Sequence, residues 1–575
     1  MHTQNLLDLT METSIDETFR YTSGPRDAEV LVVGESWGVE EAREQKPFVG
    51  QSGKEFTRII RDAGFNREEW LLTNLVNSRP PSNDLSQFTV GRAEGKKLGL
   101  SKTKGLYVNT TVNNSIISLI NLIRIVKPKL IIAVGNWPLW ALTDNYSIDT
   151  KGRAPSGIMT WRGSQLWTNL DGIEPTPVLP IVHPAAVLRQ WSLRQLAVHD
   201  LSSRVPKRSK WEPPTFNFTV RPDLTTCLRV IEDLIVRKPK ISVDLETVGN
   251  HINCLGIAWS TNDAICIPFL DIRQDELVPF YPFSEWWQIV CALRKLFSSG
   301  IEVVGQNFMY DIQFIQRYLF VTPNVTDDTL LLQHLNWPTM RKSLDFLSSL
   351  YCDYHCYWKD DRKTWHSKDN LEVLWRYNCR DAVTTLEICN ELKELTIKRG
   401  LSEQYAFQME QWWMALEMMN RGVRIDTKVR FQMKMELAAE LDKVRHWLDN
   451  VFPKWVTDSG GKTAWYNSAA QLRDLFYLKL GLPAQRNRKT GNSSLDSEAM
   501  EVLKVKAPLF KQVFENLELL RSVGVFLNTF INAPLDRDRI HCSYNVGATV
   551  TFRWSSSRSA FGIGTNLQNI PKGDD

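Results

Sequence analysis

Carboxylates mark the stretch of this sequence that is best suited to chemistry. A short buried strand that carries two acids is expected at Ile241-Ser242-Val243-Asp244-Leu245-Glu246-Thr247. Side chains alternate between the two faces of a strand, so Asp244 and Glu246 point the same way. Adjacent carboxylates repel each other, and a divalent cation between them relieves that repulsion. The pair therefore indicates a metal site.

Two further segments supply ligands of the same kind. Asn307 and Asp311 lie four residues apart, and so do Tyr377 and Asp381. Residues four apart share a face of a helix, so we expect a helix to present each pair. The four carboxylates of the three segments would then line one pocket, with enough oxygen atoms for two Mg²⁺ or Mn²⁺ ions.

In this order, D-x-E, N-x-x-x-[FY]-D and Y-x-x-x-D resemble the three motifs of the proofreading 3′–5′ exonucleases of DNA polymerases. D-x-E alone is also common as a solvated strand end, whereas the ordered set is specific. The resemblance implies a ribonuclease-H-like α/β exonuclease domain over residues 215–400. In the family pattern Asp244 bridges the metals, and Glu246 and Asp381 hold the one that activates water. Asp311 supports the other metal, and Tyr377 orients the attacking water.

The N-terminal part has the pattern of an α/β layer domain. Strands are expected at Glu29–Gly34, Trp70–Asn74, Leu130–Gly135 and Val178–Val182, with helical spacing between them. Strands that alternate with helices predict this fold class. Residues 89–104, rich in Gly and Lys, are expected to form an exposed loop.

A second resemblance rests on motifs in this part, and it covers residues 25–204. They are Gly34-Glu35-Ser36-Trp37-Gly38-Val39-Glu40-Glu41, Pro47-Phe48-Val49-Gly50, Thr73-Asn74, Arg79-Pro80-Pro81 and His183-Pro184-Ala185-Ala186-Val187-Leu188-Arg189. They resemble the uracil-DNA glycosylases of the iron–sulfur type, which read a flipped-out base in a pocket. The resemblance implies that Phe48 stacks on the base and Asn74 bonds its polar edge. It also implies that His183 stabilises the departing uracil, and that Glu41 assists the sugar cation and the attacking water.

This part departs from the glycosylase pattern in two ways. All nine cysteines lie at Cys227 or later, so the four cluster cysteines are absent and no iron–sulfur cluster is expected. Ser78 stands where one of them would fall. Trp37 replaces a proline of the pocket wall, where its bulk is expected to alter or block base entry. An active glycosylase and a retained DNA-binding or protein-contact module both stay open.

Residues 401–575 turn helical and carry a third resemblance, to the thumb and the beginning of the palm of family A DNA polymerases. Its motifs are Asn467-Ser468-Ala469-Ala470-Gln471-Leu472, Thr551-Phe552-Arg553-Trp554-Ser555-Ser556-Ser557 and Asn566-Leu567-Gln568-Asn569-Ile570-Pro571. The resemblance implies that Arg553 reaches the minor groove beside the primer end. It makes Arg486, Arg488 and Lys489 suited to phosphate contacts, which give affinity without sequence choice.

In that family the palm acids that bind the catalytic metals follow these signatures, as do the fingers. We therefore expect the N-terminal portion of a phage-type family A polymerase, without the polymerase active site. A truncated chain, a gene with an intervening sequence and a split enzyme would each account for this. In the last case a separate polypeptide would carry the remaining palm and fingers.

Composition sets the remaining expectations. The 575 residues, 43% hydrophobic and 23% charged, predict a multi-domain soluble protein. A net charge of +4 is only weakly basic, so DNA must be bound by local patches. Neither a signal peptide nor a membrane-spanning run is evident, so we expect a cytoplasmic protein, in the host cytoplasm if phage-encoded, with no membrane partner. Residues 1–24 are expected to be a tail and 205–214 a basic linker.

The function expected from these features is two-metal 3′–5′ proofreading in DNA replication. Its DNA partners would be a primer–template and its single-stranded 3′ end. One alternative is a uracil-DNA glycosylase of DNA repair. Another is a non-catalytic DNA-binding subunit of a split polymerase.

Overall fold

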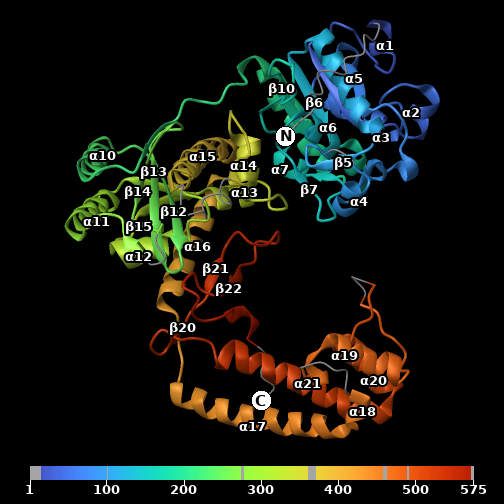
Figure 1. Ribbon diagram of the computed structural model, residues 1–575. Coiled ribbons are helices and arrows are strands. Elements are labelled where there is room, and N and C mark those ends of the chain that lie inside the picture. The colour runs from blue at the N-terminus through green and yellow to red at the C-terminus, as the bar shows by residue number, and fades with distance from the viewer. Residues whose placement is uncertain are drawn as a thin grey trace. The chain divides into compact units, whose positions relative to one another are not determined.

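The computed structural model (Figure 1) describes residues 15–99, 102–273, 277–360, 371–457, 463–487 and 491–570. Arg488 and Lys489 lie outside these ranges. Two units divide the chain: residues 1–308 with 315–400, and residues 309–314 with 401–575.

The first unit contains a five-stranded sheet. Its spatial order is β2 (Leu71–Val76), β1 (Val30–Ser36), β6 (Leu130–Val134), β10 (Pro177–Ile181) and β9 (Leu166–Trp167). The first four strands are parallel and correspond to the four predicted ones, while the short β9 is antiparallel. Parallel strands are covered on both faces, which explains why these runs are almost continuously apolar.

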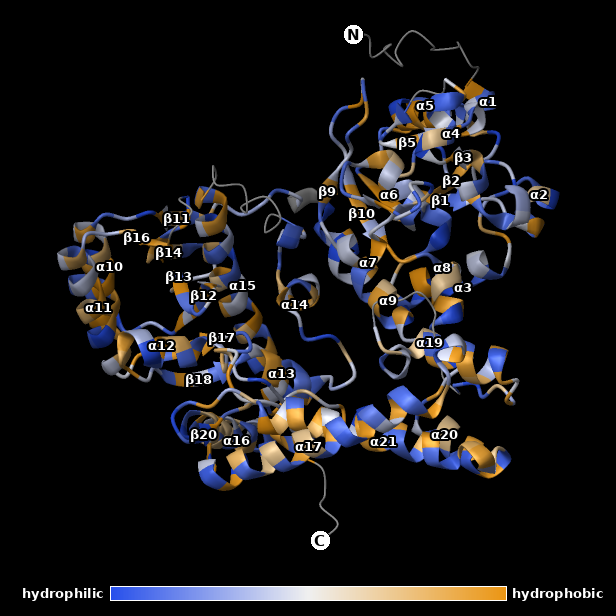
Figure 2. Cartoon of the chain, turned by 60° about the horizontal axis from the view of Figure 1, so that its bottom comes forward, coloured by the Kyte–Doolittle hydropathy of each residue, from blue (hydrophilic) through white to orange (hydrophobic). Residues whose placement is uncertain are grey.

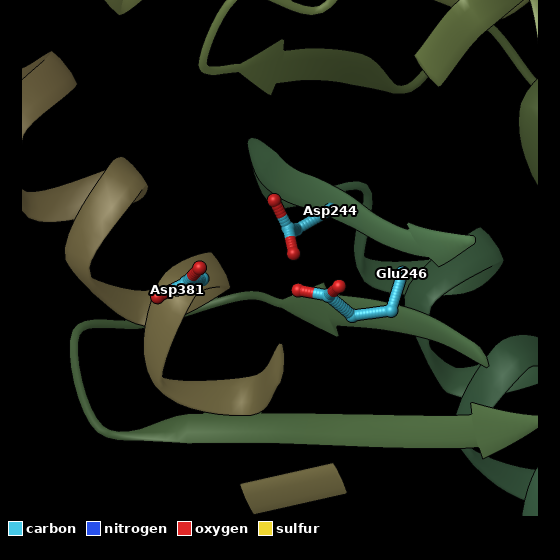
Figure 3. Close-up of side chains that lie close together, drawn as sticks. All are labelled: Asp244, Glu246 and Asp381. Carbon is cyan, nitrogen blue, oxygen red and sulfur yellow. The ribbon is translucent and has the colours of Figure 1, made fainter. Parts of the chain in front are cut away.

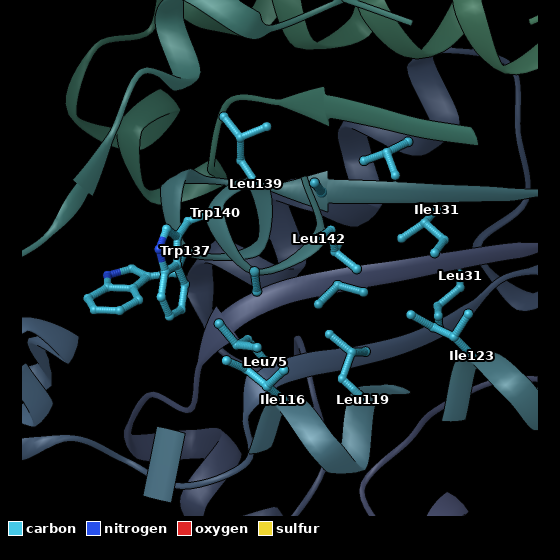
Figure 4. Packing of buried hydrophobic residues seen from close by; sticks show 14 of the residues in the cluster. Leu31, Leu75, Ile116, Leu119, Ile123, Ile131, Trp137, Leu139, Trp140 and Leu142 are labelled. Atoms are coloured by element: carbon cyan, nitrogen blue, oxygen red, sulfur yellow. The ribbon is translucent and has the colours of Figure 1, made fainter. Parts of the chain in front are cut away.

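Helices cover both faces of this sheet. One face carries α5 (Thr110–Val126) and α6 (Asn136–Leu142), and the other carries α3 (Gln51–Asp62) and α9 (Leu193–Arg204). Alternation along β1 divides its side chains between the two cores. Leu31 lies in the core with α5 and α6 (Figure 4), and Val32 in the core with α3 and α9.

A six-stranded mixed sheet follows. Its spatial order is β11 (Asn217–Val220), β14 (Asp263–Pro268), β13 (His251–Ala258), β12 (Ile241–Val248), β17 (Glu302–Gly305) and β18 (Asn324–Asp328). β12, β13 and β14 are antiparallel neighbours, and β17 and β18 join them parallel to β12. The long helix α15 (Leu371–Lys398) packs on β12–β14, where Cys254, Ala258 and Cys266 are small enough for close approach.

Buried arginines connect the two sheets within this unit. Arg162 donates to Asp200 of α9 at 2.8 Å and to Ser349 of α14 (Leu344–Tyr351) at 2.9 Å. Arg204 donates to the carbonyls of Asp353 at 2.7 Å and Ser349 at 3.1 Å. Both arginines are buried. Buried charges are stable only when paired, so these contacts require one specific docking geometry.

The predicted linker, residues 205–214, is in part folded onto the first sheet. Val205–Lys210 forms a 3₁₀ helix. Val205 and Trp211 are buried in the core with α3 and α9, and the Trp211 indole N–H donates to the Leu166 carbonyl at 2.8 Å. Apolar residues inside a basic, Pro-rich segment anchor it here, so it is not a free spacer over these residues.

Two other predicted irregular segments contain structure. The predicted tail includes α1 (Ile15–Phe19), and Ser23 N–H donates to the Leu72 carbonyl at 3.0 Å. The predicted loop at 89–104 contains β3 (Thr89–Val90), α4 (Arg92–Lys97) and β4 (Lys102–Thr103). The loop prediction relied on glycine, but Gly95 lies inside α4, where its lack of a side chain lets the helix pack closely. A Cβ there would come within 2.3 Å of the Tyr107 ring.

The second unit is mostly helical, as expected. Its main helices are α16 (Ser402–Arg421), α17 (Thr427–Val451), α19 (Ala469–Arg473), α20 (Ser497–Lys506) and α21 (Lys511–Phe526). Hydrophobic and hydrophilic residues are interspersed along α17 and α21 (Figure 2), and Leu448 and Phe514 are part of the core that the two helices share. Among its described residues are two short antiparallel strand pairs: β19 (Val423–Arg424) with β20 (Arg539–Ile540), and β21 (Ser543–Asn545) with β22 (Ser555–Ser557). In the described part of the chain, no helix combines the length and apolarity that crossing a bilayer requires.

Candidate active site

Three of the predicted carboxylates meet beside β12. Asp244 and Glu246 lie on the same face of β12, and Asp381 approaches them from α15 (Figure 3). One oxygen from each of the three lies within 4.8 Å of the others. Ile241 and Val243 are buried, which fixes the strand and thereby the direction of the acids. This set of oxygen ligands, two half-buried and one buried, fits a divalent cation.

Asn378 positions Asp244, a role that the sequence did not reveal. Its side-chain amide donates to Asp244 Oδ2 at 2.7 Å and to the Asp244 carbonyl at 3.1 Å. Gly256, opposite Asp244 on β13, makes room for it, because a Cβ there would come within 2.5 Å of Asn378 Oδ1. The signal available was the position of Asn378 between two motif residues, Tyr377 and Asp381.

Tyr377 and Asp381 share one helix, as predicted, but they also share a partner from another segment. Lys359 Nζ lies 2.9 Å from Tyr377 Oη and also donates to Asp381 Oδ2. Trp358 Nε1 donates to Asp381 Oδ1 at 2.7 Å. Nothing in the sequence around Trp358 and Lys359 indicated these contacts, which depend on the fold.

The Asn307–Asp311 pair differs from the prediction of a shared helix face. The helix α12 begins at Asp311 (Asp311–Leu319), and Asn307 precedes it with a positive φ of 53°. Asp328 holds this turn by accepting the N–H groups of Asn307 at 3.0 Å and Phe308 at 2.9 Å. Among the described residues, Asp311 is not part of the carboxylate group that Asp244, Glu246 and Asp381 form.

A second candidate site is a cavity of about 740 Å³ at the ends of β1, β2 and β6. Its lining includes the predicted residues Glu41, Phe48, Asn74 and His183. Asn74 and Phe48 meet over Gly34, where a Cβ would lie 2.2 Å from Asn74 Oδ1 and 2.7 Å from the Phe48 ring. The glycine therefore makes room for an aromatic face and an amide edge, which together can hold a planar polar base.

His183 has one defined hydrogen-bonding role in this cavity. Its Nδ1 accepts the N–H of Ala185 at 3.1 Å, at the start of α8 (Pro184–Arg189). Burial lowers the pKa of His183. A neutral imidazole that accepts at Nδ1 carries its proton on Nε2, so Nε2 is left as a donor.

Glu41 lines this cavity, as the resemblance implied, whereas Trp37 does not. Both Glu41 oxygens accept backbone N–H groups, from Gly50 at 2.8 Å and from Gly38 at 3.0 Å. Glu41 thus braces the loop that carries Phe48. Trp37 is absent from the lining and packs edge-on against Tyr21 at 5.2 Å. Its bulk therefore does not block this cavity.

The exonuclease-like part of the chain contributes to the same cavity. Thr339, Met340, Arg341 and Phe346, which follow the six-stranded sheet in sequence, are among the lining residues. Lys342 ties this loop to the end of β17, because its carbonyl accepts from Gln306 Nε2 at 2.7 Å. Arg341 and Arg189 place positive charge on the lining.

The predicted DNA-binding arginines of the second unit lie in irregular segments. Arg486 forms an isolated bridge with Ser493, and Arg553 follows Phe552, whose φ is 60°. The Arg553 backbone is held by Thr549, whose hydroxyl accepts the Arg553 N–H at 2.9 Å. Arg553 is exposed to solvent.

Three family matches divide the chain. Residues 21–202 match the uracil DNA glycosylase superfamily, residues 224–397 match a 3′–5′ exonuclease, and residues 435–575 match DNA polymerase family A.

Individual relatives agree with this division. The type-4 uracil-DNA glycosylase of Saccharolobus solfataricus is 30% identical over 180 residues, which are 31% of this chain and 70% of that protein. That of Pyrobaculum aerophilum is 30% identical over 173 residues, 30% of this chain and 74% of that protein. DNA polymerase I of Bacillus caldotenax is 30% identical over 182 residues, 30% of this chain but 19% of that protein. The chain spans less than a third of the length of such polymerase relatives.

The matched regions contain the sites described above. The glycosylase match includes Asn74 and His183, and the exonuclease match includes the three carboxylates. The exonuclease region implies use of a divalent metal. The chain therefore belongs to the uracil-DNA glycosylase superfamily through residues 21–202 and is a multidomain protein that also carries a 3′–5′ exonuclease domain and a family A DNA polymerase region.

Proposed function

We propose that the exonuclease domain removes nucleotides from the 3′ end of DNA in a metal-dependent hydrolysis. The observation that carries this proposal is the grouping of Asp244, Glu246 and Asp381, with oxygens within 4.8 Å of one another, inside a region matched to a 3′–5′ exonuclease. The substrate is a single-stranded 3′ end, such as a frayed primer terminus.

The donor set fits Mg²⁺ or Mn²⁺. Asp244, Glu246 and Asp381 would hold one ion, and the family pattern gives Asp311 the role of supporting a second. Two such ions stabilise charge on the attacking and leaving oxygens of a phosphodiester. Asn378 fixes the rotamer of Asp244 through the 2.7 Å hydrogen bond. Tyr377 orients the attacking water through its hydroxyl group.

Digestion of a 5′-labelled single-stranded oligonucleotide tests this function. We expect a ladder of products shortened from the 3′ end with Mg²⁺, and none with EDTA. An oligonucleotide whose 3′ terminus is blocked should resist digestion. Digestion that persists in EDTA, or that starts from the 5′ end, would contradict the proposal.

We propose a second function, recognition and excision of uracil, for the cavity around Asn74 and His183. The observation that favours it is the fixed Nε2 donor of His183, which can stabilise negative charge on a departing base. The relatives named as type-4 uracil-DNA glycosylases support it. Release of free uracil from a labelled strand tests it. The wild-type chain should release uracil, and His183→Ala should not. A wild-type chain that releases no uracil would contradict excision and favour a module that does not excise bases.

We propose that the family A polymerase region grips primer–template DNA through Arg486, Arg488, Lys489 and Arg553, and that it acts in DNA replication. Nucleotide addition is proposed for the whole protein of which this region is part. Arg553→Ala should weaken primer–template binding in a filter-binding assay, and unchanged binding would argue against this role.

A further inference from the structure

A lysine from outside the three carboxylate motifs lies within the exonuclease site. Lys359 Nζ is 2.9 Å from Tyr377 Oη and donates to Asp381 Oδ2. Its side chain is 23% exposed, whereas that of Asp381 is 5% exposed. The ammonium group thus reaches a nearly buried carboxylate and retains access to solvent.

The segment that carries Lys359 is fixed against α15 by several contacts. Trp358 is buried and donates to Asp381 Oδ1 at 2.7 Å. Arg380 stacks over the Trp358 ring at 4.8 Å and donates to the Cys356 carbonyl at 2.8 Å. The Lys359 Nζ lies 4.8 Å from the centre of the Tyr377 ring. Consecutive residues 358 and 359 therefore occupy both oxygens of one predicted metal ligand, which a solvated surface lysine would not do.

The hydrogen-bonding capacity of these groups assigns a direction to the Tyr377 hydroxyl. An ammonium group has three donors and no acceptor, so Tyr377 Oη must accept from Lys359. The hydroxyl proton of Tyr377 is then directed to another acceptor. The Asp381 carboxylate has about four acceptor positions and accepts from two donors, Trp358 and Lys359. It therefore keeps lone pairs for a cation.

We propose that Lys359 is a positioning residue of the exonuclease reaction. It acts through Tyr377, whose hydroxyl group it commits to donating toward the attacking water. This inference rests on the exonuclease function proposed above. The charge of Lys359 also offsets part of the repulsion among Asp244, Glu246 and Asp381, without serving as a ligand.

Kinetics of the full chain on single-stranded DNA test the proposal. We expect Lys359→Ala to lower the exonuclease kcat by about 10- to 100-fold, in the range typical of general positioning effects, with little change in KM. Lys359→Arg should recover most of the rate, because it keeps the charge and the donors. Lys398→Ala, which removes an exposed lysine of the same domain, serves as the matched control.

A double-mutant comparison separates positioning from a general loss of structure. If Lys359 acts through Tyr377, the Lys359→Ala, Tyr377→Phe double variant should be little slower than Tyr377→Phe alone. Multiplicative losses would overturn the assignment.

Mn²⁺ binding followed by electron paramagnetic resonance gives a readout that does not depend on turnover. Removal of a positive charge beside the carboxylates should leave Mn²⁺ affinity unchanged or stronger. Affinity that falls in proportion to kcat would make Lys359 a merely structural support, and Lys359→Ala with wild-type kcat would exclude any role. If the wild-type chain leaves DNA intact with Mg²⁺, the proposed function fails and this assignment fails with it.

Discussion

Asp381 shows how the chemistry of the site depends on single hydrogen bonds. Its two oxygens accept from Trp358 and Lys359, and Asp244 is held in the same way by Asn378. A carboxylate that ligates a metal must keep one rotamer, and the partners of a ligand often determine that rotamer. The motif residues are thus only part of the site, and residues without a motif fix their direction.

Asn378→Ala should slow the exonuclease without removing a ligand. Loss of a hydrogen bond to a charged group costs about 1.5–3 kcal/mol, so we expect kcat to fall roughly tenfold or more. Single-turnover digestion of single-stranded DNA measures this change. Asn217→Ala on β11 is the control, because its side chain donates to Asp263, on β14 away from the carboxylates. Equal rates for Asn378→Ala and wild type would show that Asp244 keeps its rotamer without Asn378.

At the scale of elements, the sequence predicted what local patterns determine. The apolar runs gave the four parallel strands, and alternation placed Asp244 and Glu246 on one face of β12. The pairing of Asp381 with Trp358, and the turn at Asn307, depend on contacts distant in sequence. The predictions of a loop around Gly95 and of a linker around Trp211 were wrong, because tertiary packing overrode the local preference of these segments.

Histidine at the contact between α14 and the first sheet makes this unit sensitive to acid. His355 is buried, and burial together with Arg204, Arg162 and Arg380 lowers its pKa well below the ordinary value. In the unfolded chain the His355 imidazole binds a proton near pH 6.5, whereas in the folded chain it does not. The contribution of His355 to the free energy of unfolding is therefore fully present above that pH and is lost as the pH decreases.

We therefore expect His355 to reduce the free energy of unfolding by about 1.4 kcal/mol at pH 5.5 relative to pH 7.5. Urea denaturation followed by tryptophan fluorescence at both pH values measures the change. His355→Gln should remove that part of the pH dependence, while His446→Gln, at an exposed site on α17, should not. An unaltered pH dependence in His355→Gln would contradict the assignment.

At the scale of the whole molecule, the chain combines a glycosylase superfamily domain, an exonuclease domain and a polymerase region. The first two share a buried hydrogen bond from Arg162 to Ser349, and the exonuclease loop at 339–341 lines the glycosylase-like cavity. A DNA strand held at that cavity would therefore touch both domains of the first unit.

Arg162→Met removes both the ion pair with Asp200 inside the glycosylase superfamily domain and the hydrogen bond to Ser349 of the exonuclease domain. The change leaves Asp200 buried without its partner, which costs about 3–5 kcal/mol. We expect the midpoint of thermal unfolding to fall markedly, with the tryptophan signals of both domains affected. Arg58→Met, which removes a mostly exposed arginine and leaves the buried Glu55 paired with Arg194, should cost about 1 kcal/mol or less. A midpoint within a degree of the wild-type value would contradict the structural role of Arg162.

The central claim, that Asp244 and Glu246 form the hydrolytic centre, is tested most directly by neutralising both acids. Asp244→Asn with Glu246→Gln keeps the size of each side chain and removes the charge that a divalent cation requires. Asp233→Asn, which neutralises an exposed acid of α10 (Leu224–Arg237), is the control. We predict that Mg²⁺-dependent shortening of single-stranded DNA falls at least a thousandfold in the double variant and is unchanged in the control. Shortening at the wild-type rate in the double variant would contradict the claim.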